Sequence, residues 1–247
     1  MEYGISILLS GISLGGQYAL IAIGYTMVYG ILRLINFAHG DVFMAAGLIM
    51  VYLSASLPIG VALPLMILLT VLLGFVIERA AYKPLRSAPR MSVMISAIGV
   101  SYLLQNLATY ITGGLPQMYP SLPVLSNQIT IAGTSTKMVT VVTPILVVAL
   151  VIALTQLINH TKIGAAMRAA SRDFETAQLM GIKINNVISF TFVIGSLLAA
   201  VGSALYFTSP TTPPSCRCPA PCRGCGPSWR RCSAASGPFP APWWGRF

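Results

Sequence analysis

The chain has 247 residues, of which 55% are hydrophobic and only 8% are charged, and its mean hydropathy is +0.79. Soluble domains carry roughly 25% charged residues, so this composition excludes an ordinary soluble domain and predicts an all-α integral membrane protein in a lipid bilayer. The formal net charge is +10, but no basic face interleaved with aromatic residues accompanies it, which excludes nucleic acid as a partner.

Six apolar stretches define the predicted membrane spans. A helix needs about 20 apolar residues to cross a hydrocarbon core of about 30 Å. The stretches near or above that length predict a polytopic helix bundle with six transmembrane spans, at residues 5–29, 42–57, 58–77, 91–112, 138–158 and 187–207. Together they form a transmembrane domain over residues 1–207. Met1 and Glu2 put no basic segment ahead of the first stretch, so we expect it to remain as a span rather than be cleaved as a signal.

The distribution of basic residues predicts the orientation. Connecting segments 30–41, 78–90 and 159–186 carry nine Lys and Arg residues, whereas the segments on the other side carry only Lys137. Basic residues gather in the cytoplasmic loops of membrane proteins. We therefore expect the N-terminus outside, the polar segment 113–137 outside as an ordered surface loop, and segment 159–186 in the cytoplasm.

The one long polar interruption in the second half of the chain is segment 164–182, GAAMRAASRDFETAQLMGI. Asp173 suits the N-cap of a short helix, Glu175 its positive dipole end, and Gly181 a left-handed stop. Phe174, Ala177, Leu179 and Met180 are its apolar residues. A helix of about two turns cannot bury such groups alone, so it requires either the membrane surface or a partner protein.

Two further features have competing interpretations. Asn36, His39 and Asp41 lie close together after the first span and are either a polar element of a transport pathway or a cytoplasmic turn in which Asp41 caps the second span and Arg33 snorkels. In the sixth span, Gly195, Ala199 and Ser203 form a ridge of small residues at four-residue spacing. This ridge serves either close helix packing or a transport-specific role, and we expect close helix packing.

Three stretches, in order along the chain, carry a family resemblance. They are GISLGGQYALIAIGYTMVYGILRLINFAHGDVFMAAG at 11–47, ERAAYKPLR at 78–86 and TKIGAAMRAASRDFETAQLMGI at 161–182. With them the chain resembles the membrane permease subunit of branched-chain amino acid ABC importers, of the high-affinity leucine, isoleucine and valine type. The third stretch is similar to the cytoplasmic signature of that family, where the permease docks on its ATPase.

The resemblance implies a function and a set of partners. The chain would form part of the translocation pathway for branched-chain amino acids in a bacterial-type inner membrane. Its partners would be a second permease subunit, cytoplasmic ABC ATPase subunits and an external solute-binding protein, which segment 113–137 would contact. Asn36, His39 and Asp41 would be pathway candidates. Residues 161–186 would be a coupling loop, in which Arg168 and Arg172 orient the short helix 173–180 by charge. The residues that would couple to the ATPase are Gly164, Arg168, Ala169, Arg172, Asp173, Phe174, Glu175, Ala177, Leu179, Met180, Gly181 and Ile182.

The segment 208–247 differs in composition from the rest of the chain and is expected to be a separate, non-family region. It holds all five cysteines: Cys216, Cys218, Cys222, Cys225 and Cys232. At face value these indicate a zinc or disulfide site. A shifted reading of the codons for 221–245 is compatible instead with an apolar, Gly-rich stretch similar to the next span of the family. We therefore expect segment 208–247 to be a frameshift product without a metal site. The spans that should follow would then be missing, which would leave the ridge on the sixth span facing lipid. We expect such a chain to assemble poorly or to be inactive.

Other functions are less well supported by the motifs. Urea, amides or other amino acids are alternative substrates within the same class, and a membrane-anchored metal or redox sensor using the C-terminal cysteines is an alternative from another. The sequence has no His-Glu-x-x-His, paired catalytic carboxylates or Gly-x-Ser-x-Gly, so no catalytic residues, cofactors or enzymatic activity are predicted. It also has no Gly-x-x-x-x-Gly-Lys loop, so a partner chain must hydrolyse ATP.

Overall fold

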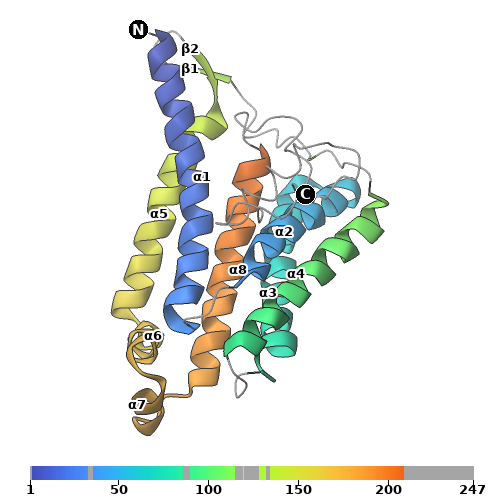
Figure 1. Ribbon diagram of the computed structural model, residues 1–247. Coiled ribbons are helices and arrows are strands. Elements are labelled where there is room, and N and C mark those ends of the chain that lie inside the picture. The colour runs from blue at the N-terminus through green and yellow to red at the C-terminus, as the bar shows by residue number, and fades with distance from the viewer. Residues whose placement is uncertain are drawn as a thin grey trace, which may run out of the picture.

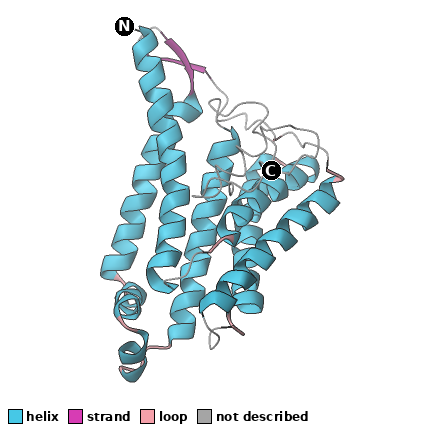
Figure 2. Ribbon diagram, in the orientation of Figure 1, coloured by secondary structure: helices cyan, strands magenta, loops and turns pink. Residues whose placement is uncertain are grey.

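The computed structural model describes residues 2–32, 36–85, 90–114, 119, 128–131 and 134–208. Helices dominate these residues, and the strands form one short hairpin (Figure 2). In chain order the elements are α1 (Glu2–Leu32), α2 (Ala38–Ser56), α3 (Ile59–Ile77), the π-helix η1 (Glu78–Tyr82), α4 (Arg90–Thr112), β1 (Gln128–Ile131), β2 (Thr134–Lys137), α5 (Met138–His160), α6 (Lys162–Arg172), α7 (Phe174–Leu179) and α8 (Ile184–Thr208).

Six of these helices are long and apolar enough to cross a membrane, which confirms the predicted all-α polytopic fold. The spans are Ile7–Ile31, Ala38–Ser56, Ile59–Tyr82, Met91–Thr112, Met138–His160 and Ile184–Thr208. Two boundaries differ from the prediction by more than three residues. The second span begins at Ala38 rather than Val42, and the third continues through η1 instead of ending in a loop at Glu78. Both extensions carry polar residues whose side chains are buried against other helices, so hydropathy alone placed the start of the second span too late and the end of the third too early.

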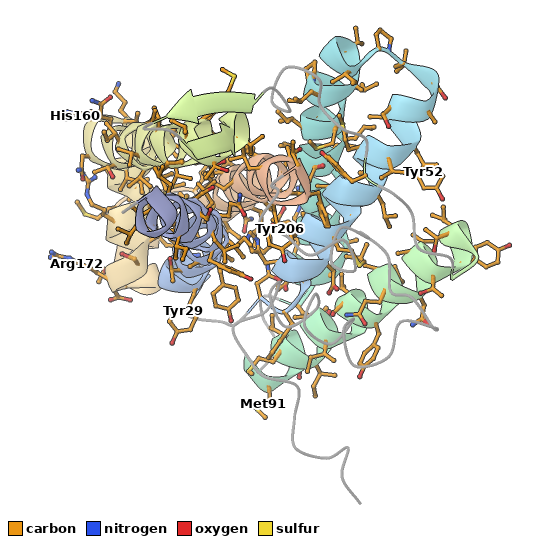
Figure 3. All side chains as sticks on the ribbon, turned by 90° about the horizontal axis from the view of Figure 1, so that it is seen from above. Tyr29, Tyr52, Met91, His160, Arg172 and Tyr206 are labelled. Atoms are coloured by element: carbon orange, nitrogen blue, oxygen red, sulfur yellow. The ribbon has the colours of Figure 1, made fainter. Side chains whose placement is uncertain are left out.

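Helix α8 lies at the centre of the bundle. Viewed along the bundle, α1 and α5 lie on one side of it and α2 and α3 on the other, with α4 at the edge (Figure 3). Ala199 and Ser203 have exposed fractions of 0%, and Gly195 is also buried. Close helix packing by this ridge is therefore confirmed, and the expectation that the ridge faces lipid is wrong. The ridge is covered because α1, α2 and α3 all pack on α8.

Glycine permits the closest of these helix contacts. A Cβ on Gly74 of α3 would lie 2.6 Å from the Ser196 Cβ of α8, and one on Gly24 of α1 would lie 2.9 Å from the His39 Nε2 of α2. A Cβ on Gly195 would lie 3.2 Å from Val28. Within a membrane, helices associate through such close approach because lipid is as apolar as the helices themselves.

The two ends of the bundle differ in structure (Figure 1). The antiparallel β1–β2 hairpin, with Gln128 paired to Lys137 and Ile131 to Thr134, lies at the end that holds the N-terminus. The hairpin accounts for part of the segment 113–137. Most of the rest of that segment lies outside the described residues. Helices α6 and α7 lie at the opposite end.

Candidate coupling surface and buried polar residues

Helix α6 is anchored to the bundle by one face. The Thr161 hydroxyl caps its N-terminus by accepting a hydrogen bond of 3.0 Å from the Gly164 amide. Its buried residues are Gly164, Met167 and Ala170, at three-residue spacing, and Met167 and Ala170 pack with Ile31 of α1 and Val187 of α8. Sequence analysis expected one short helix in this region. The cap and the apolar spacing of this face are the signals that would have predicted α6 as well.

Gly164 and Arg168 join α6 to the end of α5. A Cβ on Gly164 would lie 2.6 Å from the backbone Cα of Ile158, a distance that no residue other than glycine tolerates. The Arg168 guanidinium donates a hydrogen bond to the Ile158 carbonyl. A positive charge is favourable there because the last carbonyls of a helix carry its negative dipole end. Ala169 is half-buried, and Arg172 is exposed in the last turn of α6.

Helix α7 has the predicted position and ending. Asp173 is extended between α6 and α7, immediately before the first helical residue. At the other end, the Gly181 amide donates to Gln178 and the Ile182 amide to Ala177, at 2.9 and 3.1 Å, and Gly181 has φ +82°. These two bonds define a Schellman motif, which confirms the predicted left-handed stop.

The apolar residues of α7 divide between the bundle and the surface. Ala177 is 4% exposed, whereas Leu179 and Met180 are 85% and 83% exposed. Ile182 packs on the cluster that anchors α6. The side chains of Phe174 and Glu175 lie outside the described residues. Two large apolar side chains therefore project from the end of the molecule, beyond the six spans.

The three polar residues near the start of α2 have different surroundings, and all are buried. Asn36 precedes the helix and its Oδ1 accepts hydrogen bonds from the Tyr82 hydroxyl at 2.6 Å and the Ala38 amide at 3.1 Å. Asp41 accepts hydrogen bonds from the Ser101 hydroxyl and, at 3.0 Å, from Gln105 Nε2, both on α4. The alternative in which Asp41 caps the second span is therefore wrong, because Asp41 lies inside α2 and contacts α4. Arg33 lies outside the described residues.

His39 lines a small cavity among four helices. The cavity lies between α1, α2, α3 and α8 and has room for about one water molecule. His39 is 4% exposed, and its Nε2 has no hydrogen-bond partner among the described residues. Asn36 lines the same cavity, while Asp41 does not belong to its lining. The three residues that the sequence predicted as one group are thus separated. Asn36 and His39 line the cavity, and Asp41 joins α2 to α4.

Glu78 is a buried polar residue that sequence analysis left in a loop. It is 0% exposed at the start of η1, and its Oε2 accepts a 2.9 Å hydrogen bond from the Ser189 hydroxyl of α8. Together with the Tyr82–Asn36 bond, this contact joins η1 to α2 and α8. The signal in the sequence was a carboxylate directly following an apolar stretch.

Metal chemistry has no support from the part of the chain that is described. Within it, no three His, Cys, Asp or Glu residues come together as a metal site. The five cysteines, and the rest of the segment 209–247, lie outside the described residues.

A six-span helix bundle with a membrane-external helix pair defines a multi-pass membrane protein, and comparison with known proteins gives its family. The profile described as "Branched-chain amino acid transport system / permease component" matches residues 7–219. The chain therefore belongs to this family of transport permeases. The match ends a short way into the segment 208–247.

Individual relatives agree with the family. The chain is 37% identical over 217 residues to the high-affinity branched-chain amino acid transport system permease protein LivH of Salmonella typhimurium, and 36% identical to LivH of Escherichia coli K12; each alignment covers 82% of this chain and 70% of the relative. It is 37% identical over 212 residues to the permease protein BraD of Pseudomonas aeruginosa, covering 80% of this chain and 69% of the relative. No solved structure matches.

Proposed function

We propose that the chain is the transmembrane permease subunit of an ABC importer for branched-chain amino acids, and that α7 couples it to a cytoplasmic ATPase. The observation that carries the coupling role is the pair Leu179 and Met180, more than four-fifths exposed at the end of the bundle. Large apolar groups outside the spans are costly in water and mark an interaction site. The substrate class is supported by the names of the relatives LivH and BraD.

We further propose that the membrane is a bacterial-type inner membrane and that α7 lies on its cytoplasmic side. In the sequence, segments 30–41, 78–90 and 159–186, the last of which contains α6 and α7, carry nine Lys and Arg residues, whereas the rest of residues 1–207 carries only Lys137. The bias toward basic cytoplasmic loops favours an N-terminus outside. The hairpin end then faces the external solute-binding protein, and a second permease subunit and the ATPase subunits complete the importer.

The contacts of α6 support a mechanical route from α7 into the spans. Ala177 and Ile182 pack inward from α7 and its C-terminal turn, and α6 packs on α1, α5 and α8. Gly164 holds α6 against the end of α5 without a side chain between them. A displacement of α7 by an ATPase would therefore move three spans together. Arg168 and Arg172 supply positive charge beside this route.

Asn36 and His39 are our candidates for the inner part of the pathway. They line the cavity among α1, α2, α3 and α8, near the helix ends on the α6 side. Asp41 acts one step away by holding α4 to α2. A neutral zwitterion needs no fixed charge along its route, so no charged residue of the pathway selects one neutral substrate over another. Urea, amides or other amino acids are therefore alternative substrates, and an uptake assay would distinguish them.

The coupling role is tested with the double variant Leu179→Ala/Met180→Ala in the complete importer, reconstituted into liposomes. Full burial of a Leu or Met side chain contributes about 1.5–3 kcal/mol. Loss of most of that contribution lowers the affinity for the ATPase about tenfold or more, and ATP-dependent leucine uptake falls with it. Ile163→Ala is the matched control, because Ile163 is an exposed apolar residue of α6 outside the spans.

ATPase binding and leucine uptake equal to those of the control variant would refute the coupling role. Orientation is measured on the same preparation with Arg172→Cys, since Arg172 is exposed beside α7. In a chain whose five cysteines at 216–232 are replaced by serine, a membrane-impermeant thiol reagent should label this cysteine in inside-out vesicles and leave it unlabelled in intact cells. The opposite pattern would reverse the proposed topology.

A further inference from the structure

Three buried polar side chains on α1 and α8 have no hydrogen-bond partner among the described residues. Ser13, Gln17 and Ser203 are each 0% exposed. The Ser13 and Ser203 hydroxyls and both polar atoms of the Gln17 amide are unpartnered within that part of the chain. Buried polar groups in proteins are nearly always hydrogen-bonded, and leaving one unsatisfied costs free energy. Four such atoms on two facing helices therefore call for a polar ligand.

The helix register brings these side chains into the same part of the bundle. Helices α1 and α8 run antiparallel side by side (Figures 1 and 3). The Leu20 Cβ lies 3.7 Å from the position of a Cβ on Gly202, and the rings of Tyr18 and Tyr206 are 6.3 Å apart. In this antiparallel register Gln17 lies opposite the Tyr206 region and Ser203 opposite the Leu20 region, so the two residues are within about one helical turn of each other along the axes. Ser13 follows one turn nearer the N-terminus of α1.

Helix α5 adds polar groups at the same level. Val147 lies 3.3 Å from the position of a Cβ on Gly16, so Thr143, one turn earlier, is level with Ser13. Thr143 is 0% exposed, and its hydroxyl donates to the Val139 carbonyl of its own helix, so only its oxygen is left, as an acceptor. The next residue, Pro144, has no N–H, so the carbonyl of Thr140 loses its usual helical donor. The junction of α1, α5 and α8 thus offers both donors and acceptors.

An apolar cluster from the same three helices adjoins these polar groups. Its buried members are Leu20 of α1, Val147 of α5, and Leu198 and Leu205 of α8. A site with neutral hydrogen-bonding groups beside an apolar cluster matches an amino acid with an apolar side chain. An amide N–H and a hydroxyl can donate to its carboxylate, and an amide oxygen can accept from its ammonium group. No fixed charge is required, because a zwitterion has no net charge.

We propose that Ser13, Gln17 and Ser203 form a binding site for a zwitterionic amino acid with an apolar side chain, in the half of the bundle nearer the N-terminus of α1. We call this site the station. This inference rests on the proposed transport function. Packed side chains close the station here, so binding requires α1 and α5 to separate from α8. Helix α6 contacts all three of these helices at their opposite ends, which links the station to the proposed coupling surface.

The test uses Gln17→Met, which keeps the length of the side chain and removes its polar atoms. The complete importer is reconstituted into liposomes, and leucine uptake, ATP hydrolysis and the melting temperature are measured. We expect an unchanged or higher melting temperature, because an unsatisfied amide is removed, continued ATP hydrolysis, and uptake reduced at least tenfold. Thr70→Val is the matched control. Thr70 is 0% exposed on α3, and its hydroxyl donates to its own helix at Met66, so uptake should stay near wild type.

Each outcome decides the proposal. Uptake within twofold of wild type in Gln17→Met overturns the station and leaves the amide a structural role. If Gln17→Met does not assemble, Ser203→Ala decides by the same readouts; failure of both to assemble also overturns the station. Absence of leucine uptake both by the wild-type importer and by an importer whose reading frame is restored over segment 221–245 would instead overturn the proposed function. If both the wild type and Gln17→Met take up leucine, within twofold of each other, the station is overturned and the proposed function stands.

Discussion

The contact between Asp41 and α4 gives a quantitative prediction. Asp41 of α2 accepts hydrogen bonds from Ser101 and Gln105, and α4 otherwise packs mainly on α2 and η1. Helix α4 lies at the edge of the bundle, with large exposed apolar residues along it. Since lipid competes equally well for those apolar residues, the polar contact should contribute much of what holds α4 in place. The substitution Asp41→Leu removes it.

The magnitude follows from the number of bonds lost. Hydrogen bonds between membrane helices contribute on average about 0.6 kcal/mol and at most about 1.7 kcal/mol each. Two bonds to Asp41 therefore give an expected destabilisation of about 1–3 kcal/mol. The loss is limited because Gln105 Nε2 also lies 3.2 Å from the Ser101 hydroxyl, so these two groups keep each other as partners. Asp41→Asn retains an acceptor oxygen and should lose about half as much.

The assay is reversible denaturant unfolding of the protein in mild detergent, with a double-mutant cycle between Asp41→Leu and Gln105→Leu. We expect a coupling free energy of about 0.5–1.5 kcal/mol, since one bond joins the two side chains. Asn106→Ala is the control, because Asn106 is exposed and its amide donates within α4 to Tyr102. A change below about 0.5 kcal/mol for Asp41→Leu, with no coupling, would show that apolar packing alone holds α4.

Two further predictions concern glycine. Gly74→Ala should destabilise the bundle by about 1–3 kcal/mol, because the new Cβ would lie 2.6 Å from the Ser196 Cβ, and Ser196→Gly in the same chain should restore most of the loss; a neutral Gly74→Ala, or no restoration, would contradict this contact. Gly181→Ala should cost about 1 kcal/mol at φ +82°, so the Ile182 amide should exchange with deuterium about fivefold faster, while Gly99→Ala, in open helical surroundings, should leave exchange unchanged. Equal exchange in both variants would refute the role of the left-handed turn.

Much of the coupling surface could be predicted from local sequence. The stop at Gly181 and the start after Asp173 are properties of a few neighbouring residues, and the structure has both. Local sequence could not predict the division of the apolar residues of α7. Ala177 is buried and Leu179 exposed because α6 covers only one side of the short helix, and α6 itself is positioned by Ile31 and Val187, which are distant in sequence.

The buried polar residues were the least predictable part of the molecule. Asn36, His39 and Asp41 form one group in sequence. In the structure, however, Asp41 accepts hydrogen bonds from α4, and Asn36 and His39 line a cavity. Glu78 was expected in a loop, and its burial depends on Ser189, more than a hundred residues later in the chain. Gln17 carried no signal beyond being a polar residue within an apolar stretch.

The sequence by itself determined the number, order and approximate ends of the six spans, because crossing a bilayer depends on the length and apolarity of one continuous stretch. Only the tertiary structure decided which helix is central and which polar groups meet. In a membrane the lipid-facing and protein-facing sides of a helix are both apolar, so the sequence periodicity that reveals the buried face of a soluble helix is largely lost. Neighbours are then chosen by close approach at residues such as Gly74 and Gly195, and by hydrogen bonds between distant segments.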